Sequence, residues 1–237
     1  MNLGLLIYFV DHLNVTTADR WDEADAAFQR GVELNPGLLD AQYEYGLFLA
    51  RSGRYDEAIS HFLKIQELSP LSHHAYYGLG WIYNSMGQFE KAYDYLQKAQ
   101  DLAPSNFYVG SLLYRSRIFM LYKQGRYEEL LKEAQASGSG LYLMMAYRGL
   151  NEHEQATALF DSLRVEYQRQ GASKFSLGRL YALFGDYEVA LTLLEGYFAE
   201  IPLGQKRWFM SQIHGELGEL HDNPRYQALM AQTGLKY

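Results

Sequence analysis

The sequence contains no cysteine among its 237 residues, and it has only five prolines. The lack of cysteine excludes a disulfide framework, a thiolate metal site and a cysteine nucleophile. Runs of like charge are also missing, because the formal net charge of −7 is spread along the chain. No segment therefore looks like a nucleic-acid-binding tail, and we expect no direct contact with nucleic acid.

Long hydrophobic runs are absent as well. The longest apolar stretch, residues 3–10, is far shorter than the roughly 20 residues that a helix needs to cross a bilayer. No Lys or Arg precedes it, as one would in a signal peptide. We therefore expect a cytoplasmic protein that does not enter a membrane, with enough hydrophobic residues (48%) to bury a substantial core.

Four segments share one pattern of glycine, polar residue, aromatic residue and acid, and they begin at Gly53, Gly87, Gly125 and Gly185. A shift of 34 residues, the distance from Gly53 to Gly87, also carries Ala58 onto Ala92 and Pro70 onto Pro104. A period that holds at several independent positions indicates a structural repeat.

Each period contains two stretches with helical spacing of apolar residues. In the third period, Leu79 and Tyr83 belong to the first stretch, and Leu96 belongs to the second. Gly87 is expected to end the first helix in a left-handed conformation. Pro104 follows the second helix, which it could not continue. The pattern predicts antiparallel helix pairs.

These residues resemble the tetratricopeptide repeat, whose pattern is W-x2-L-G-x2-Y, then A-x3-F, then P. The resemblance implies an all-α fold: a right-handed superhelical solenoid of antiparallel helix pairs, about fourteen helices in all, with a C-terminal capping helix. We expect residues 1–237 to form one solenoid. Its units lie at about 5–38, 39–72, 73–106, 107–137, 138–170 and 171–204, with capping helices in 205–237.

The shared pattern has a packing explanation. The aromatic residue packs into the corner between the two helices, and the small residue lets the second helix approach the first. The aromatic positions are Trp21, Tyr55, Phe89, Tyr127 and Tyr187, and the small positions are Ala24, Ala58, Ala92 and Ala190. We expect Gly80 and Ala92 to lie where helices touch, and Asn151 to replace the turn glycine of the fifth unit.

The end of the chain carries a second resemblance. Residues 221–235, HDNPRYQALMAQTGL, resemble the terminal helix of tetratricopeptide regions that follow effector domains in bacterial signalling proteins. Such proteins include class III nucleotide cyclases and winged-helix transcriptional activators. The resemblance implies a regulatory or interaction segment, and it carries over no catalytic residue.

Candidates for catalysis or metal binding have simpler explanations. Adjacent side chains such as His73 and His74 point about 100° apart on a helix, so they are poorly placed to chelate one ion. Carboxylate pairs, such as Asp56 with Glu57, begin second helices and complement the helix dipole. The run of residues 137–140, SGSG, lacks the Lys-Ser/Thr of a phosphate loop. We expect no catalytic residue, no metal and no cofactor.

The family resemblance implies that the first helix of each unit lines a concave groove. Tyr43 and Leu47 stand where chaperone-binding members of the family use Lys and Asn, so we expect no carboxylate clamp. The partner-binding groove is expected to consist of Tyr43, Tyr77, Trp81, Asn84, Arg115, Phe119, Tyr122, Arg148 and Arg179. The alternative is that the superhelix closes on itself and these side chains pack together.

The sequence thus predicts a non-catalytic protein-interaction module that binds a peptide or helix. It is expected to be the regulatory or sensing part of a bacterial signalling or transcription-regulating protein. The alternative is a homo-oligomerisation scaffold. Residues 3–13 are apolar on more than one face and lack the polar outer face of a terminal repeat, so we expect a homodimer through this N-terminal helix.

Overall fold

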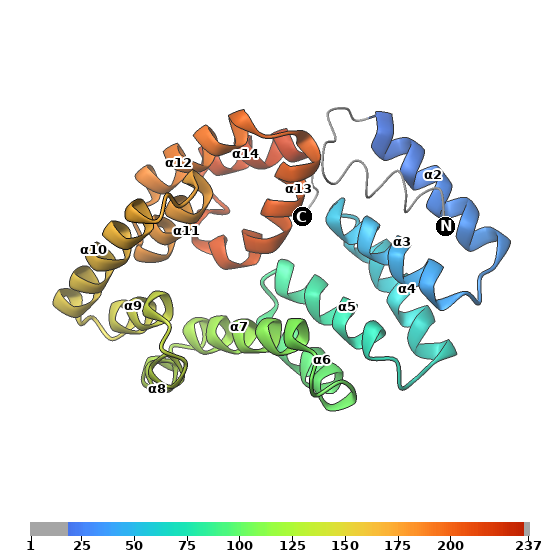
Figure 1. Ribbon diagram of the computed structural model, residues 1–237, viewed down its shortest axis with the longest axis horizontal. Coiled ribbons are helices and arrows are strands. Elements are labelled where there is room, and N and C mark those ends of the chain that lie inside the picture. The colour runs from blue at the N-terminus through green and yellow to red at the C-terminus, as the bar shows by residue number, and fades with distance from the viewer. Residues whose placement is uncertain (1–18, 235–237) are drawn as a thin grey trace. The chain divides into compact units, whose positions relative to one another are not determined.

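The computed structural model describes residues 19–234, and these residues form helices without a β-strand (Figure 1). The helix predicted at residues 3–13 lies outside the described residues. The helices are α2 (Asp19–Leu34), α3 (Leu39–Arg51), α4 (Tyr55–Leu68), α5 (His73–Ser85), α6 (Phe89–Leu102), α7 (Phe107–Lys123), α8 (Tyr127–Ser137), α9 (Gly140–Gly149), α10 (His153–Arg169), α11 (Lys174–Phe184), α12 (Tyr187–Glu200), α13 (Leu203–Ile213), the 3₁₀ helix η1 (His214–Leu220) and α14 (Pro224–Thr233). The all-α fold of paired helices is confirmed.

The predicted turn residues end the first helix of each pair. Gly53, Gly87, Gly125 and Gly185 all have positive φ, and Asn151 adopts the same conformation with φ of 61°. After α5, the amide of Gly87 bonds to the carbonyl of Asn84 at 3.0 Å, and the next amide bonds to the carbonyl of Tyr83 at 2.9 Å. These two bonds are those of a Schellman motif, which satisfies the free carbonyls at a helix end.

Proline follows the second helices as predicted. α2, α4, α6 and α12 end two residues before Pro36, Pro70, Pro104 and Pro202, respectively. Pro224 is the first residue of α14, where its missing amide proton costs no intrahelical bond.

The small positions of the repeat are where helices come closest. Ala24, Ala58, Ala92 and Ala190 are all at most 2% exposed. A Cβ atom added to Gly80 would lie 2.5 Å from Cγ of Leu96 and 3.3 Å from the carbonyl oxygen of Ala92. The predicted contact between Gly80 of α5 and Ala92 of α6 is therefore confirmed.

The acidic residues that begin second helices make local ion pairs. Glu57 accepts two hydrogen bonds from Arg54, of 2.7 and 2.6 Å, and Glu129 accepts two of the same lengths from Arg126. Each arginine immediately precedes its helix, so the pair ties the turn to the first helical turn. These carboxylates support structure at the positive end of a helix dipole.

Contacts between Cα atoms divide the chain into two compact units. Unit 1 contains the chain up to Tyr114 together with residues 201–216 and 228 onward, and unit 2 contains residues 115–200 and 217–227. Each unit is described by itself. That residues 1–237 form one continuous solenoid stays a prediction.

Each unit includes a segment from the end of the chain. In unit 1, α13 contacts α3 and α5. In unit 2, the guanidinium of Arg225 donates two hydrogen bonds to Glu195, of 3.0 and 2.7 Å, and another of 2.7 Å to Glu188. Arg225 therefore ties the start of α14 to α12.

We predict that Gly80→Ala destabilises the protein, although alanine is normally the better helix former. The added methyl group meets Leu96 at 2.5 Å, and overpacking of this kind costs about 1–3 kcal/mol. The matched control is Gly110→Ala in α7, where the methyl group would meet only the flexible end of Gln100 at 3.3 Å. Urea midpoints check this: the Gly80 variant should fall below wild type and the Gly110 variant should not. Equal midpoints for the two variants would contradict the helix contact.

Candidate protein-binding faces

In unit 1, side chains of α3 and α5 form a continuous face. Tyr43 and Arg51 lie eight residues apart on α3, and His74, Tyr77 and Trp81 follow one another at helical spacing on α5. The rings of Tyr43 and His74 stack at 4.7 Å. At the other end, the guanidinium of Arg51 lies 5.9 Å from the centroid of the Trp81 ring. We call these five residues the α3–α5 face.

Burial and neighbouring charged or polar groups shift the pKa values of two side chains of the α3–α5 face, Tyr43 and Arg51. Burial, followed by the neighbouring Tyr77 and Glu44, raises the pKa of the Tyr43 hydroxyl above its usual value. Burial lowers the pKa of Arg51 to about 10, and the nearby Tyr77 opposes this shift. Arg51 remains charged at neutral pH, is half-buried, and lies beside the Trp81 ring. Such a cation suits a carboxylate or a carbonyl group of a ligand.

The four predicted groove residues of unit 1 differ in exposure. Tyr43 and Tyr77 are half-buried, whereas Trp81 is 5% exposed and Asn84 is 1% exposed. Trp81 packs within the hydrophobic core of unit 1. The Trp81 ring therefore belongs to the buried side of the α3–α5 face, whereas Tyr43 and Tyr77 are its more accessible aromatic side chains. Their contact with a partner stays a prediction.

Sequence reasoning missed Arg51 and His74. Both lie on helical stripes with predicted residues: Arg51 is eight residues after Tyr43, and His74 is three residues before Tyr77. Extending each predicted stripe by one helical turn would have found them.

In unit 2, Arg148 of α9 is the centre of a hydrogen-bond network. Its guanidinium donates to the hydroxyls of Tyr122 and Tyr187, at 3.2 and 3.3 Å, and to the carbonyl of Leu183 at 3.3 Å. It also forms an ion pair of 3.2 Å with Glu219 of η1, which in turn accepts a hydrogen bond from Tyr187. This arginine therefore connects three helices with η1.

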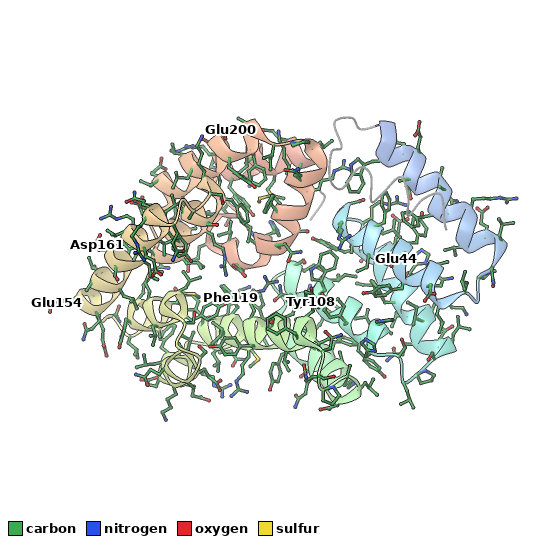
Figure 2. The ribbon with its side chains drawn as sticks, viewed as in Figure 1. Glu44, Tyr108, Phe119, Glu154, Asp161 and Glu200 are labelled. Atoms are coloured by element: carbon green, nitrogen blue, oxygen red, sulfur yellow. The ribbon has the colours of Figure 1, made fainter. Side chains whose placement is uncertain are left out.

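The remaining predicted groove residues of unit 2 are partly or fully covered. Phe119 of α7 is 3% exposed, and its ring meets Tyr142 edge-on at 6.3 Å (Figure 2). Tyr122, Arg115 and Arg179 are half-buried. Burial raises the pKa of the Tyr122 hydroxyl, and the positive charge of Arg148 opposes that shift. The structure brings Tyr122 and Arg148 into contact through the hydrogen bond described above, and their contact with a partner stays a prediction.

Unit 1 also has an open pocket of about 200 Å³, lined by Trp21, Asp22, Asp25, Phe48, Ser52, Arg54, Arg207 and Gly234. Three of its charged side chains already have partners within the chain. Asp25 pairs with Arg54, and Arg207 stacks over Trp21 at 4.8 Å and donates to the Thr233 carbonyl at 2.8 Å. The pocket therefore lies where α2, α3 and the end of the chain pack together, and its ion pair and hydrogen bond stabilise that packing.

The described part of the chain shows no other kind of site. Residues 19–234 contain no cluster of three or more His, Asp or Glu side chains placed to hold a metal ion. Among the same residues, no helix has the length and apolarity required to span a membrane.

Comparison with known proteins identifies the repeat. Residues 37–105 match a family model described as tetratricopeptide repeat, and no curated protein sequence matches the chain. The fold is similar to a tetratricopeptide repeat protein from Parabacteroides merdae, with a TM-score of 0.58 and 11% identity over 89% of this chain and 82% of that one. PilF of Pseudomonas aeruginosa aligns with a TM-score of 0.49 and 18% identity over 97% of this chain and 94% of that one. YrrB, described as a TPR protein with an unusual peptide-binding site, aligns with a TM-score of 0.45 and 19% identity over 80% and 97%.

We predict that Arg148→Ala lowers the free energy of unfolding by about 1–2 kcal/mol, because Tyr122, Tyr187 and Glu219 lose a hydrogen-bond donor together. The control is Arg169→Ala, which removes an exposed arginine from the last turn of α10. Urea unfolding followed by circular dichroism measures both. Identical midpoints for wild type and Arg148→Ala would show that the network adds no net stability.

Proposed function

We propose that the chain, which is a tetratricopeptide repeat protein, serves as a non-catalytic protein-interaction module. Its binding site is the α3–α5 face, and its ligand is a peptide or helix with apolar anchors and some acidic character. Repeat solenoids of this kind create extended concave surfaces for such ligands.

The observation that carries the proposal is the combination of residues on the α3–α5 face. Tyr43 and Tyr77 are half-buried aromatic side chains, and Arg51 is a half-buried cation on the same face, beside the Trp81 ring. Aromatic residues and arginine dominate binding energy at protein interfaces. Tyrosine buries a large area with little loss of conformational entropy, and the planar guanidinium of arginine can form paired hydrogen bonds with a carboxylate. Apolar side chains of a ligand would pack against the two tyrosines, and an acidic group would meet Arg51.

We further propose that the module is the regulatory or sensing part of a bacterial signalling or transcription-regulating protein that acts in the cytoplasm. Support comes from the resemblance of residues 221–235 to terminal helices of such proteins. The described part of that segment, residues 221–234, contains α14, which Arg225 anchors to α12. The proposal requires no direct contact with nucleic acid.

A matched pair of tyrosines tests the binding site. Tyr77→Ala should weaken binding of a partner recovered by pull-down by about 2 kcal/mol, roughly thirtyfold, as expected for a central anchor. Tyr76→Ala is the control. Its hydroxyl bonds to the carbonyl of Pro70 at 3.2 Å and its ring lies 6.0 Å from Lys98 of α6, away from the α3–α5 face. Isothermal titration calorimetry measures both affinities. Equal affinities for the two variants would place the site elsewhere.

A homo-oligomerisation scaffold is the second candidate, because unit 1 exposes apolar side chains at the junctions between successive repeats. Leu34, Leu68 and Leu102 recur every 34 residues and are 70%, 45% and 38% exposed. Leu71 and two aromatic residues at the start of α7 are each at least 75% exposed: Phe107 and Tyr108, of which Tyr108 is labelled in Figure 2. An exposed apolar row of this kind is a common feature of self-association surfaces.

Light scattering over a concentration range tests the second candidate. Wild type should form dimers or larger species as its concentration rises, and the double variant Leu71→Glu/Phe107→Glu should remain a monomer. A wild-type chain that stays monomeric at every concentration would rule out the scaffold.

A further inference from the structure

Glu44 of α3, labelled in Figure 2, is a half-buried carboxylate that lies one position after Tyr43 of the α3–α5 face. In the part of the chain that the structure describes, its side chain makes no hydrogen bond or ion pair. Asp25 of α2 is also half-buried, but it pairs with Arg54 and accepts a hydrogen bond from Tyr45. Glu44 is therefore a carboxylate whose cationic partner the described residues do not supply.

The surroundings of Glu44 disfavour its negative charge. Burial, followed by the charge of Asp40, raises the pKa of Glu44 above its usual value. Asp40 lies four residues earlier on α3, and like charges at this spacing destabilise a helix. A carboxyl group whose pKa is raised in the folded state makes the protein less stable as it ionises with rising pH. A positive group of a ligand placed beside Glu44 would offset both effects.

Glu44 and Arg51 stand at opposite ends of an aromatic row. After burial itself, Tyr77 and Glu44 raise the pKa of the Tyr43 hydroxyl, so both lie close to it. Tyr77 likewise opposes the lowering of the Arg51 pKa by burial, so it also lies close to that guanidinium. The side chains follow one another in the order Glu44, Tyr43, Tyr77 and Arg51. The α3–α5 face thus has an acidic end, a basic end and an aromatic surface between them.

The distance between the two charged ends favours a helical ligand. Glu44 and Arg51 are seven residues apart on α3, which is close to two full turns, or roughly 10 Å along the helix axis. A ligand helix that runs beside α3 places its own residues at this spacing on one side and at the same distance. In an extended strand, about three residues cover this distance, and their side chains point to opposite faces of the strand. The helix therefore presents both of its charges to α3 at once, whereas the strand does not.

We propose that the partner of the α3–α5 face is a helix with a basic and an acidic residue seven positions apart and apolar residues between them. Its basic residue pairs with Glu44, and its acidic residue pairs with Arg51. Its apolar residues pack on Tyr43 and Tyr77. Such a helix is a narrower class of ligand than the peptide or helix of the proposed function, on which its assignment rests.

The experiment selects helical binders without knowledge of the natural partner. The probe is a phage-displayed library of a small helical domain that is randomised on one helix face. Selection uses the full chain as target and the Tyr77→Ala chain as counter-target, so that the retained binders require the α3–α5 face. We expect these binders to carry Lys or Arg and Asp or Glu seven positions apart, with apolar residues between them.

A charge-neutral variant then tests the pairing with Glu44. Glu44→Gln should weaken the selected binders about fivefold or more in isothermal titration calorimetry, because the amide keeps the size of the side chain and removes its charge. This loss should disappear when the basic residue of the binder is also replaced by Gln, as a double-mutant cycle requires for a direct pair. Glu23→Gln is the matched control, since it neutralises an exposed carboxylate of α2 outside the α3–α5 face.

Stability separates lost pairing from damaged folding. Glu44→Gln should have a urea midpoint at or above that of wild type, because it removes a half-buried charge and its repulsion from Asp40. Replacing only the basic residue of the binder should cause the same fivefold loss on the wild-type chain, so the test does not depend on how the variant folds.

The outcomes distinguish this partner class from the proposed function. If Tyr77-dependent binders lack a selected basic residue, or bind Glu44→Gln as tightly as wild type, the partner class is wrong and the proposed function stands. If no Tyr77-dependent binder is recovered, the proposed function is wrong, and the partner class is overturned with it.

Discussion

The rest of this structure depends on one kind of contact. Two paired helices approach each other closely at a glycine, because glycine has no side chain to hold them apart. At Gly80 an added Cβ would come within 3.3 Å of the Ala92 carbonyl, and at Gly178 the corresponding distance to the Ala190 carbonyl is 3.2 Å. The two sites are 98 residues apart in sequence and have the same geometry. Because this approach fixes the pairing of the helices, it also decides which side of each first helix faces its paired helix and which side faces away from it. The α3–α5 face is the consequence of a packing rule.

The local parts of the structure could be predicted from the sequence because they depend on neighbouring residues alone. Asn151 shows this best, since it was expected to replace a turn glycine and it has the positive φ of one. Buried alanines at fixed offsets from the turns follow from the same reasoning. The period of 34 residues carries this information from one repeat to the next, so a pattern that is clear in α3 to α6 also places the helices of weaker repeats.

The surroundings of the candidate site could not be predicted in the same way, because they depend on contacts between distant segments. The Oγ of Ser85 on α5 lies 2.8 Å from the carbonyl oxygen of Ser211 on α13, 126 residues later, and no periodicity links the two residues. Arg148 was expected at the edge of a groove, and the network with Tyr122, Tyr187 and Glu219 becomes visible only in the folded unit. Sequence spacing predicted the residue types of an interface, but it gave no information about which of them the chain itself contacts.

The end of the chain changes how stability is built up in this protein. In a simple repeat array each unit contacts only its neighbours, so stability is a sum of local terms. Here α13 adds a long-range contact to α3 and α5 in unit 1, and Glu219 adds one to Arg148 in unit 2. Each of these contacts joins segments that are far apart in the sequence. The stability of each unit therefore depends on the end of the chain as well as on its neighbouring repeats, and a substitution there acts on helices formed much earlier in the chain.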